Sequence, residues 1–547
     1  MSLSPKVERA CPPLWAAVLV ALIVGAAAAV RVRLLGLPLD RDEGEYAYLA
    51  QLLLAGVAPY AQAYNFKMPG IYAVYALMLA LLGQTPTGIH LGLLVADAIT
   101  TVLLFLIAVR LFATRVAVVA VAAFAALSLS PRLYFTSAYA EHFVLPPVLL
   151  GVLVLLHALD RRRLPRFLGS GVLFGAAFLM KQSGGAFALF ALLYVLLALR
   201  DDARRRLIAA AALAAGALAP FAALCVLMRV VGTFDNFWFW TVTYASAYAT
   251  ATSPRDGVLN LGWALRWILP TSYLAVALAG LGLSALLWDR ETRARRLVVL
   301  LLLGASLLAT SAGLYFRHQY FILLLPVLGI LAGVAVDAVA RRLGPVRAPA
   351  LRYGVPIALA AVPLLHLVYL ERAFLFTGTP HQVLRALYGT NPFPESVEIA
   401  RYIRERTSPD ERIAVVGSEP QIYFYARRRG ATGYVYTYPL MEPQPYAAEM
   451  QRQMIHEIEV LEPRFIVFVK ILSSWQVTPR SDTTIFHWFD GYQKRYDRVG
   501  VVEILSLAQT RYLWGPEAAT YTPSTDAWLA IFERRRAAHA GGATRER

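Results

Sequence analysis

The sequence predicts a polytopic α-helical membrane protein, with about 11 transmembrane helices followed by a C-terminal α/β domain outside the cytoplasm. Of its 547 residues, 58% are hydrophobic and 16% are charged, whereas soluble proteins carry roughly 25% charged residues. Apolar runs separated by arginine clusters occupy positions 14 to about 370, as expected of membrane spans. We therefore expect a transmembrane domain over residues 1–370 and a more polar domain over 371–547.

The net charge of +17 comes mostly from arginines at the ends of apolar runs. This placement favours orientation in a lipid bilayer over nucleic-acid binding, so we expect no nucleic-acid partner. Cys11 precedes the first run and Cys225 lies inside a later one. Neither position suits a disulfide, a metal site or an exposed nucleophile.

Arginine clusters predict the orientation of the spans. Eighteen arginines lie in five short loops, at 110–115, 161–166, 200–206, 290–296 and 341–352. The alternating loops carry far fewer basic residues, so the positive-inside rule places the five clusters in the cytoplasm and the C-terminal domain outside. The predicted spans are 14–30, 91–109, 116–131, 143–159, 167–180, 184–199, 207–228, 269–288, 297–313, 320–339 and 353–370.

Two N-terminal segments admit two interpretations each. Leu14–Val30 ends in alanines like a signal peptide, but the many later spans favour a retained anchor. Ile71–Leu82 is apolar but only roughly 18 Å long as a helix, against a bilayer core of about 30 Å. If it crosses the membrane, the preceding loop is cytoplasmic; if it lies along the surface, that loop is outside and the spans number 11.

The loop after the first span is unusually charged. Four carboxylates (Asp40, Asp42, Glu43 and Glu45) precede Tyr46, and a lone lysine follows in Asn65-Phe66-Lys67-Met68-Pro69-Gly70. Charges close to lipid are costly and usually serve chemistry or binding. The alternative is a hydrated loop whose acids only end the helix.

The motifs of this loop resemble those of the GT-C glycosyltransferases. The pattern is Asp42-Glu43-x-x-Tyr46, a Gly56-x-x-Pro59-Tyr60 turn and Lys67-x-Pro69 before a short helix. Protein O-mannosyltransferases and lipid A aminoarabinose transferases are similar over roughly residues 14–340, most strongly over 39–75. The resemblance implies that the first external loop, about residues 31–88, faces a polyprenyl-phosphate-linked sugar and that the following short helix lies along the membrane surface.

The resemblance implies that Asp42 is the catalytic base and that Glu43 is a structural or acceptor-orienting partner. A sugar on a polyprenyl phosphate already has a good leaving group, so one carboxylate that deprotonates the acceptor hydroxyl suffices. Attack opposite the phosphate inverts the anomeric centre. We expect Asp40 and Glu45 to remain solvated.

Two cations are candidates for binding the donor phosphate, which gains negative charge as it departs. Lys67 matches the lysine of the family's Lys-x-Pro motif, and Arg317 lies in a Tyr315–Tyr320 segment similar to segments of bacterial members. Each has a simpler interpretation, because lysine and arginine also anchor helices at the membrane interface.

Further candidates for acceptor or sugar contacts lie on the predicted outer loops: Tyr64, Glu141, His142, Lys181 and Gln182. The family commonly has an acid, often aspartate, near the position of Glu141. Glu141 could instead be a charge that favours the start of a helix, His142 an interfacial residue, and Lys181 an anchor.

Asp97 lies inside an apolar run, where it is either functional or simply hydrated near the outer surface. The aromatic run 234–248 suits an interfacial belt or a surface that stacks on sugar rings. Clustered carboxylates can hold a divalent cation, but the relatives are thought not to need one. We assign no metal and no cofactor.

The C-terminal segment alternates between helix and strand patterns. We expect helices over 394–406, 421–428 and 446–461, and strands over 412–417, 432–438, 464–470, 498–505 and 527–533. This alternation predicts an α/β domain on a largely parallel sheet, with a role in acceptor recognition or as a lid. The tail 534–547 is expected to be disordered.

The predicted function is transfer of a sugar from a polyprenyl-phosphate donor to an extracytoplasmic lipid, glycan or protein acceptor, by a multi-pass protein of the cell's inner (plasma) membrane. A transporter or flippase of a lipid-linked glycan is the alternative, although we find no internal repeat of the kind that transporters show. A non-catalytic membrane scaffold would leave the acidic loop unexplained.

Overall fold

The computed structural model describes residues 13–199 and 202–535, which form two compact units. We call residues 13–37 and 66–387 the transmembrane unit, and residues 38–65 and 388–535 the sheet unit. The acidic loop therefore folds with the C-terminal segment. The domain boundary at residue 370 stays a prediction. Cys11, Arg200 and nearly all of the predicted disordered tail lie outside the described residues.

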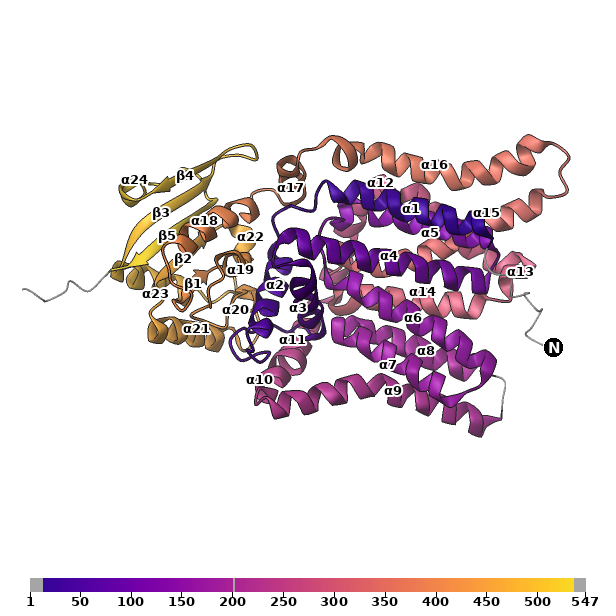
Figure 1. Ribbon diagram of the computed structural model, residues 1–547, viewed down its shortest axis with the longest axis horizontal. Helices are drawn as coiled ribbons and strands as arrows, with labels where there is room; N and C mark the ends of the chain where they lie inside the picture. The colour runs from indigo at the N-terminus through magenta and orange to yellow at the C-terminus, as the bar shows by residue number, and fades with distance from the viewer. Residues whose placement is uncertain (1–12, 200–201, 536–547) are drawn as a thin grey trace, which may run out of the picture. The chain divides into compact units, whose positions relative to one another are not determined.

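The transmembrane unit consists of helices, many of which run alongside one another (Figure 1). They are α1 (Leu14–Val32), α3 (Gly70–Leu82), α4 (Pro86–Leu111), α5 (Thr114–Ser128), α6 (Ala140–Arg161), α7 (Leu164–Met180), α8 (Gly185–Ala198), α9 (Ala203–Val230), α10 (Phe234–Trp238), α11 (Ala245–Thr250), α12 (Pro254–Trp288), α13 (Arg290–Arg293), α14 (Arg296–Ser311), α15 (Leu325–Leu343), α16 (Val355–Leu370) and α17 (Pro380–Tyr388). A π-helix, Phe239–Tyr244, connects α10 to α11, and a 3-10 helix, His318–Leu324, precedes α15.

Eight helices in the described part of the chain are long and apolar enough to cross a membrane. The shorter apolar helices α5, α7 and α8 coincide with three further predicted spans. The predicted class, a polytopic helical membrane protein, is confirmed, whereas the count of 11 spans stays a prediction. Helix α3 has 13 residues and buries one face through Ile71, Tyr72 and Tyr75, while Leu77 and Leu81 are exposed.

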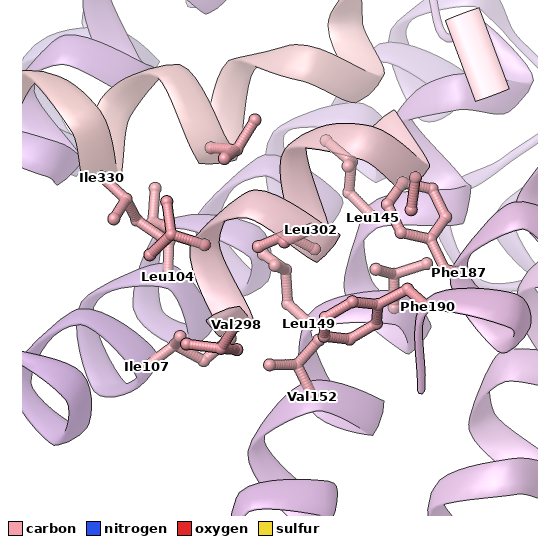
Figure 2. Close-up of a cluster of buried hydrophobic side chains, with 14 of the residues drawn as sticks. Leu104, Ile107, Leu145, Leu149, Val152, Phe187, Phe190, Val298, Leu302 and Ile330 are labelled. Atoms are coloured by element: carbon pink, nitrogen blue, oxygen red, sulfur yellow. The ribbon is translucent and has the colours of Figure 1, made fainter. Parts of the chain in front are cut away.

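A large hydrophobic cluster holds the transmembrane helices together. Figure 2 shows Leu104 and Ile107 of α4, Leu145 and Leu149 of α6, Phe187 and Phe190 of α8, Val298 and Leu302 of α14 and Ile330 of α15 gathered around one interior. Each of these side chains is nearly or fully buried between the helices. In a membrane, such packing between helices contributes van der Waals contact rather than a hydrophobic driving force.

Glycines let α7 and α9 approach closely. A Cβ atom at Gly171 would lie 2.1 Å from the carbonyl oxygen of Leu213, and one at Gly216 would lie 2.1 Å from that of Leu168. Small residues at helix contacts allow this approach in membranes. This packing holds the middle of α7 against α9, and Lys181 and Gln182 follow the C-terminal end of α7.

The sheet unit contains a five-stranded sheet in the order β1-β2-β5-β3-β4 (Figure 1). Its strands are β1 (Ile413–Val416), β2 (Phe465–Lys470), β3 (Tyr496–Ile504), β4 (Thr510–Trp514) and β5 (Trp528–Arg534). Its helices are α2 (Arg41–Leu54), α18 (Phe393–Glu405), α19 (Gln421–Ala426), α20 (Tyr438–Met441), α21 (Ala447–Leu461), α22 (Leu472–Trp475), α23 (Thr484–Tyr492) and α24 (Pro516–Thr520).

The sheet differs from the predicted one in two respects. Only β1 and β2 pair in parallel, while β2–β5, β3–β5 and β3–β4 are antiparallel, so the prediction of a largely parallel sheet was wrong. The predicted strand over 432–438 does not form. Periodicity identifies a strand but not its neighbour or direction, and β5 inserts between β2 and β3.

A buried carboxylate ties β3 to the chain that leads into β5. Glu503 accepts hydrogen bonds from the hydroxyl of Tyr521 at 2.5 Å, from the backbone and hydroxyl of Ser524 at 2.5 and 2.9 Å, and from the backbone of Thr525 at 2.7 Å. Burial raises the pKa of Glu503, but these hydrogen bonds outweigh it and lower the pKa to about 2.

Candidate functional site

The acidic stretch forms the N-terminus of α2 through a capping box. The Asp40 side chain accepts a hydrogen bond from the Glu43 backbone at 3.0 Å, and Glu43 Oε2 accepts one from the Asp40 backbone at 3.2 Å. Asp40, Glu43 and Glu45 are all buried. The expectation that Asp40 and Glu45 remain solvated was therefore wrong, because capping and packing draw the start of this helix into the sheet unit.

Asp42 is the one carboxylate of the four that is not fully buried. Its Oδ1 accepts a hydrogen bond of 3.3 Å from the hydroxyl of Tyr436. A base must remain reachable by its substrate, so the exposure of Asp42 suits the predicted role better than that of its neighbours.

Arg41 attaches this helix to the C-terminal segment of the same unit. Its guanidinium forms a buried ion pair with Glu419 at 2.5 Å. It also donates hydrogen bonds to the Tyr438 hydroxyl at 2.9 Å, to Asn391 at 3.0 Å and to the Ser418 carbonyl. Sequence analysis missed Arg41 and Tyr436, since nothing local in the sequence pairs residue 41 with residue 419 or residue 42 with residue 436.

Tyr64 lies in the structural framework of the sheet unit. Its backbone N–H donates to the Gly433 carbonyl at 2.8 Å, and its hydroxyl donates to Glu457 at 3.1 Å. Burial, reinforced by Glu457, raises the pKa of Tyr64 above its usual range. These contacts hold the end of the loop against the C-terminal segment, and a contact with sugar or acceptor stays a prediction.

In the transmembrane unit, Glu141 and Lys181 form an ion pair between the start of α6 and the end of α7. Glu141 is buried, and the Lys181 ammonium also lies 3.7 Å from the centre of the Tyr320 ring. The neighbouring Gln182 donates a hydrogen bond to the carbonyl of Phe66 at 2.6 Å. Lys181 and Gln182 thus link the chain beside Lys67 to Glu141.

An aromatic stack connects the two predicted phosphate-binding segments. The rings of Phe66 and Tyr248 stack at 4.6 Å, and those of Tyr248 and Tyr315 at 4.4 Å. The guanidinium of Arg317 lies 5.8 Å from the centre of the Tyr315 ring. Phe66 directly precedes Lys67, so segments that are far apart in sequence meet on one side of the transmembrane unit.

Together these interactions close a circuit that we call the contact ring. It is formed by Phe66, Gln182, Lys181, Tyr320, Arg317, Tyr315 and Tyr248. Arg317 joins Tyr320 to Tyr315, since the Tyr320 backbone donates to the Arg317 carbonyl at 2.9 Å. Lys67 adjoins the ring next to Phe66. Lys67, Lys181, Gln182 and Arg317 are all half-buried. The predicted aromatic run contributes Tyr248 to this ring rather than forming only an interfacial belt.

The backbone before Arg317 is strained. Leu314 and Phe316 have φ of 58° and 45°, and Gly313 has φ of 71°. Non-glycine residues in this region cost of order 1–3 kcal/mol each and persist where the surrounding structure demands them, often at functional sites. This turn sets the direction of the backbone at Arg317.

Asp97 is buried and paired rather than hydrated. Its Oδ2 lies 2.6 Å from Arg31 Nη1, and its Oδ1 lies 3.0 Å from His142 Nδ1. Arg31 also donates to the Phe135 carbonyl at 3.0 Å. His142 Nε2 is buried with no hydrogen-bond partner among the described residues. This network fixes the orientation of the residue next to Glu141.

The chain resembles known proteins both in sequence and in fold. Residues 66–226 match the family described as dolichyl-phosphate-mannose-protein mannosyltransferase. The match includes Lys67, Glu141, His142, Lys181 and Gln182. It begins after Asp42 and Glu43. No curated protein matches the chain significantly.

Solved structures share the fold at low sequence identity. The oligosaccharyltransferase AglB from Archaeoglobus fulgidus, in complex with an inhibitory peptide and a dolichol-phosphate, is 12% identical, with a TM-score of 0.53 over 92% of this chain and 74% of its own. ArnT from Cupriavidus metallidurans, bound to undecaprenyl phosphate, is 16% identical, with a TM-score of 0.54 over 83% of this chain and 93% of its own.

Apo ArnT from the same organism is also 16% identical, with a TM-score of 0.56 over 94% of this chain and 98% of its own. The transmembrane helices and the smaller sheet domain thus have counterparts over nearly the whole length of that protein. The predicted resemblance is confirmed: this chain is a polytopic membrane protein with the fold of the GT-C glycosyltransferases.

Proposed function

We propose that this protein is an inverting glycosyltransferase that moves a sugar from a polyprenyl phosphate to an acceptor on the extracytoplasmic side of the cell membrane. The contact ring carries the proposal, because it gathers the segments of Lys67, Lys181 and Arg317 together with Glu141. The family match and the fold support it. AglB and ArnT were solved with dolichol-phosphate and undecaprenyl phosphate, respectively, which suggests the class of donor.

In the proposed reaction, the acceptor hydroxyl attacks the anomeric carbon of the donor. A new bond joins the acceptor oxygen to that carbon, and the bond between the carbon and the phosphate oxygen breaks. The polyprenyl phosphate leaves with the electron pair, and the acceptor proton passes to Asp42. Since the leaving group needs no protonation, one base is enough, and attack opposite the phosphate inverts the anomeric centre.

Lys67 and Arg317 are the proposed ligands of the donor phosphate. A fixed cation beside the departing oxygen stabilises the charge that develops in the transition state. Arginine can bind phosphate in a bidentate manner, whereas lysine acts as a point charge. Glu141, Lys181, Gln182 and His142 are proposed to contact the sugar or the acceptor through hydroxyl hydrogen bonds.

The decisive experiment compares purified wild-type protein with Asp42→Asn, using a panel of polyprenyl-phosphate sugars and envelope extracts as acceptors. We expect transfer by the wild type and a loss of roughly 10²–10⁴ in kcat in the variant, the usual contribution of a general base. Normal transfer by the variant would refute the base assignment. Movement of the lipid-linked sugar across vesicles, with no transfer to any acceptor, would favour a flippase instead.

The orientation can be tested by labelling intact cells with a membrane-impermeant maleimide. Ala55 is exposed in the loop that carries the acidic pair, and Ala294 is exposed in a predicted cytoplasmic loop. In a background without Cys11 and Cys225, we expect Ala55→Cys to react and Ala294→Cys to be protected until the cells are permeabilised. The reverse pattern would place the proposed chemistry in the cytoplasm and contradict the proposal.

A further inference from the structure

The C-terminal segment of the sheet unit holds each of the residues around Asp42. The Tyr388 hydroxyl donates to Asp40 Oδ2 at 2.9 Å, and Glu419 pairs with Arg41 at 2.5 Å. Three consecutive side chains, at positions 40, 41 and 42, thus each contact a different part of the C-terminal segment, the third through the Tyr436 hydroxyl.

The rest of α2 is packed just as closely in this unit. A Cβ atom at Gly44 would lie within 2.8 Å of the backbone of Gln421. The ring of Tyr48 stacks on that of Tyr423 at 5.0 Å, and the Tyr48 hydroxyl accepts the backbone N–H of Gly430 at 2.8 Å. Since the helix touches the segment through both backbone and side chains, it has little freedom to shift or rotate.

We propose that the C-terminal segment is part of the catalytic apparatus, in which Tyr436 is a positioning residue that orients the carboxylate of Asp42. This inference rests on the proposed function and assigns a role to the C-terminal domain. Tyr436 lies in the chain that leads into α20, and the Tyr438 ring packs edge-on against it at 4.7 Å. Tyr438 in turn binds Arg41, so the two tyrosines hold adjacent residues of α2.

The hydrogen bond from Tyr436 has two physical consequences. It restricts rotation of the Asp42 side chain, and a fixed base does not have to be ordered again at each turnover. It also stabilises the ionised form of the carboxylate relative to the neutral form. Removing only this hydroxyl should therefore slow the chemical step. It should also shift the acid limb of the pH profile of kcat to higher pH.

Tyr436→Phe tests the inference, with Tyr496→Phe as its matched control. Tyr496 is a tyrosine of the same unit and is buried, whereas Tyr436 is half-buried. The Tyr496 hydroxyl donates to the Pro463 carbonyl at 3.0 Å, away from α2. We expect Tyr436→Phe to lower kcat about tenfold, to leave the KM for the polyprenyl-phosphate sugar within about twofold and to shift the acid limb upward. Tyr496→Phe should match the wild type in all three.

A wild-type kcat and pH profile in Tyr436→Phe would overturn the inference while leaving the proposed function intact. If the wild type itself transfers no sugar, the proposed function fails first. A readout independent of activity is amide hydrogen exchange in Glu419→Gln, which removes the charge that pairs with Arg41. We expect faster exchange across α2 and unchanged exchange across α3. Unchanged exchange in α2 would contradict the inference that Glu419 and Arg41 hold α2 against the C-terminal segment.

Discussion

Replacing Gly44 with alanine perturbs the contact between α2 and α19 by a single methyl group. An ideal Cβ at this position lies 2.5 Å from Gln421 Cβ, 2.7 Å from its backbone nitrogen and 2.8 Å from its Cα. Ordinary contacts of this kind are 3.4–4 Å. Two of the three atoms belong to the backbone and no side-chain rotation can relieve them, so α2 must move by roughly 1 Å.

Two opposing effects decide the energetic outcome. Alanine favours a helix over glycine by about 1 kcal/mol, whereas overpacking costs about 1–3 kcal/mol. Because the overlap is with backbone, we expect an overpacking cost of about 2–3 kcal/mol. After the gain of about 1 kcal/mol in helix propensity, the variant should lose about 1–2 kcal/mol of local stability. Since the moved helix carries Asp42, a displacement of about 1 Å should also reduce sugar transfer by roughly 10²-fold.

The assay is amide hydrogen exchange of α2 in the intact protein, followed by transfer kinetics. A loss of about 1–2 kcal/mol corresponds to a roughly 5- to 30-fold rise in exchange through local opening. Gly491→Ala is the matched control: it lies in α23 of the same unit, and its added Cβ would meet nothing within 4 Å. Wild-type exchange and activity in Gly44→Ala would refute the close packing of α2.

Three further outcomes are expected. Lys67→Ala should raise the KM for the polyprenyl-phosphate donor more than that for the acceptor in steady-state kinetics; an unchanged donor dependence would make Lys67 an interfacial anchor. Lys181→Met leaves Glu141 buried without its cation, which should cost about 3–5 kcal/mol and lower the thermal midpoint in detergent, and adding Glu141→Gln should restore most of the loss. The pKa of Glu503 is depressed from 4.5 to about 2, so its stabilising contribution is present above pH 4.5 and lost as the pH falls through 2. After allowance for solvent screening, this contribution amounts to roughly 1–2 kcal/mol. Glu503→Gln should therefore flatten the pH dependence of unfolding between pH 5 and 2, and an unchanged dependence would contradict the depressed pKa.

Local patterns were enough to predict most of the secondary structure. Each membrane span must satisfy its own backbone hydrogen bonds and expose apolar side chains to lipid, so composition alone reveals it. Strands β1, β2, β3 and β5 are also evident, because each contains a run of mostly apolar, buried residues. Strand β4 was missed because Thr510–Trp514 is short and none of its five residues is fully buried, so it lacks a buried apolar run.

The sequence by itself determined the class of the protein and marked Lys67, Glu141, Lys181 and Gln182. The fold places Lys181 and Gln182 in the contact ring, with Lys67 next to Phe66 of that ring and Glu141 paired with Lys181. Only the tertiary structure decided that Asp40 and Glu45 are buried, that the sheet is mostly antiparallel and that α2 folds with the C-terminal segment. The physical reason is that the residues of a helix or strand themselves determine whether that element can be exposed to lipid or to water. The partner of a strand or of a buried charge depends instead on which surfaces meet, and a pair such as Arg41 and Glu419 lies 378 positions apart.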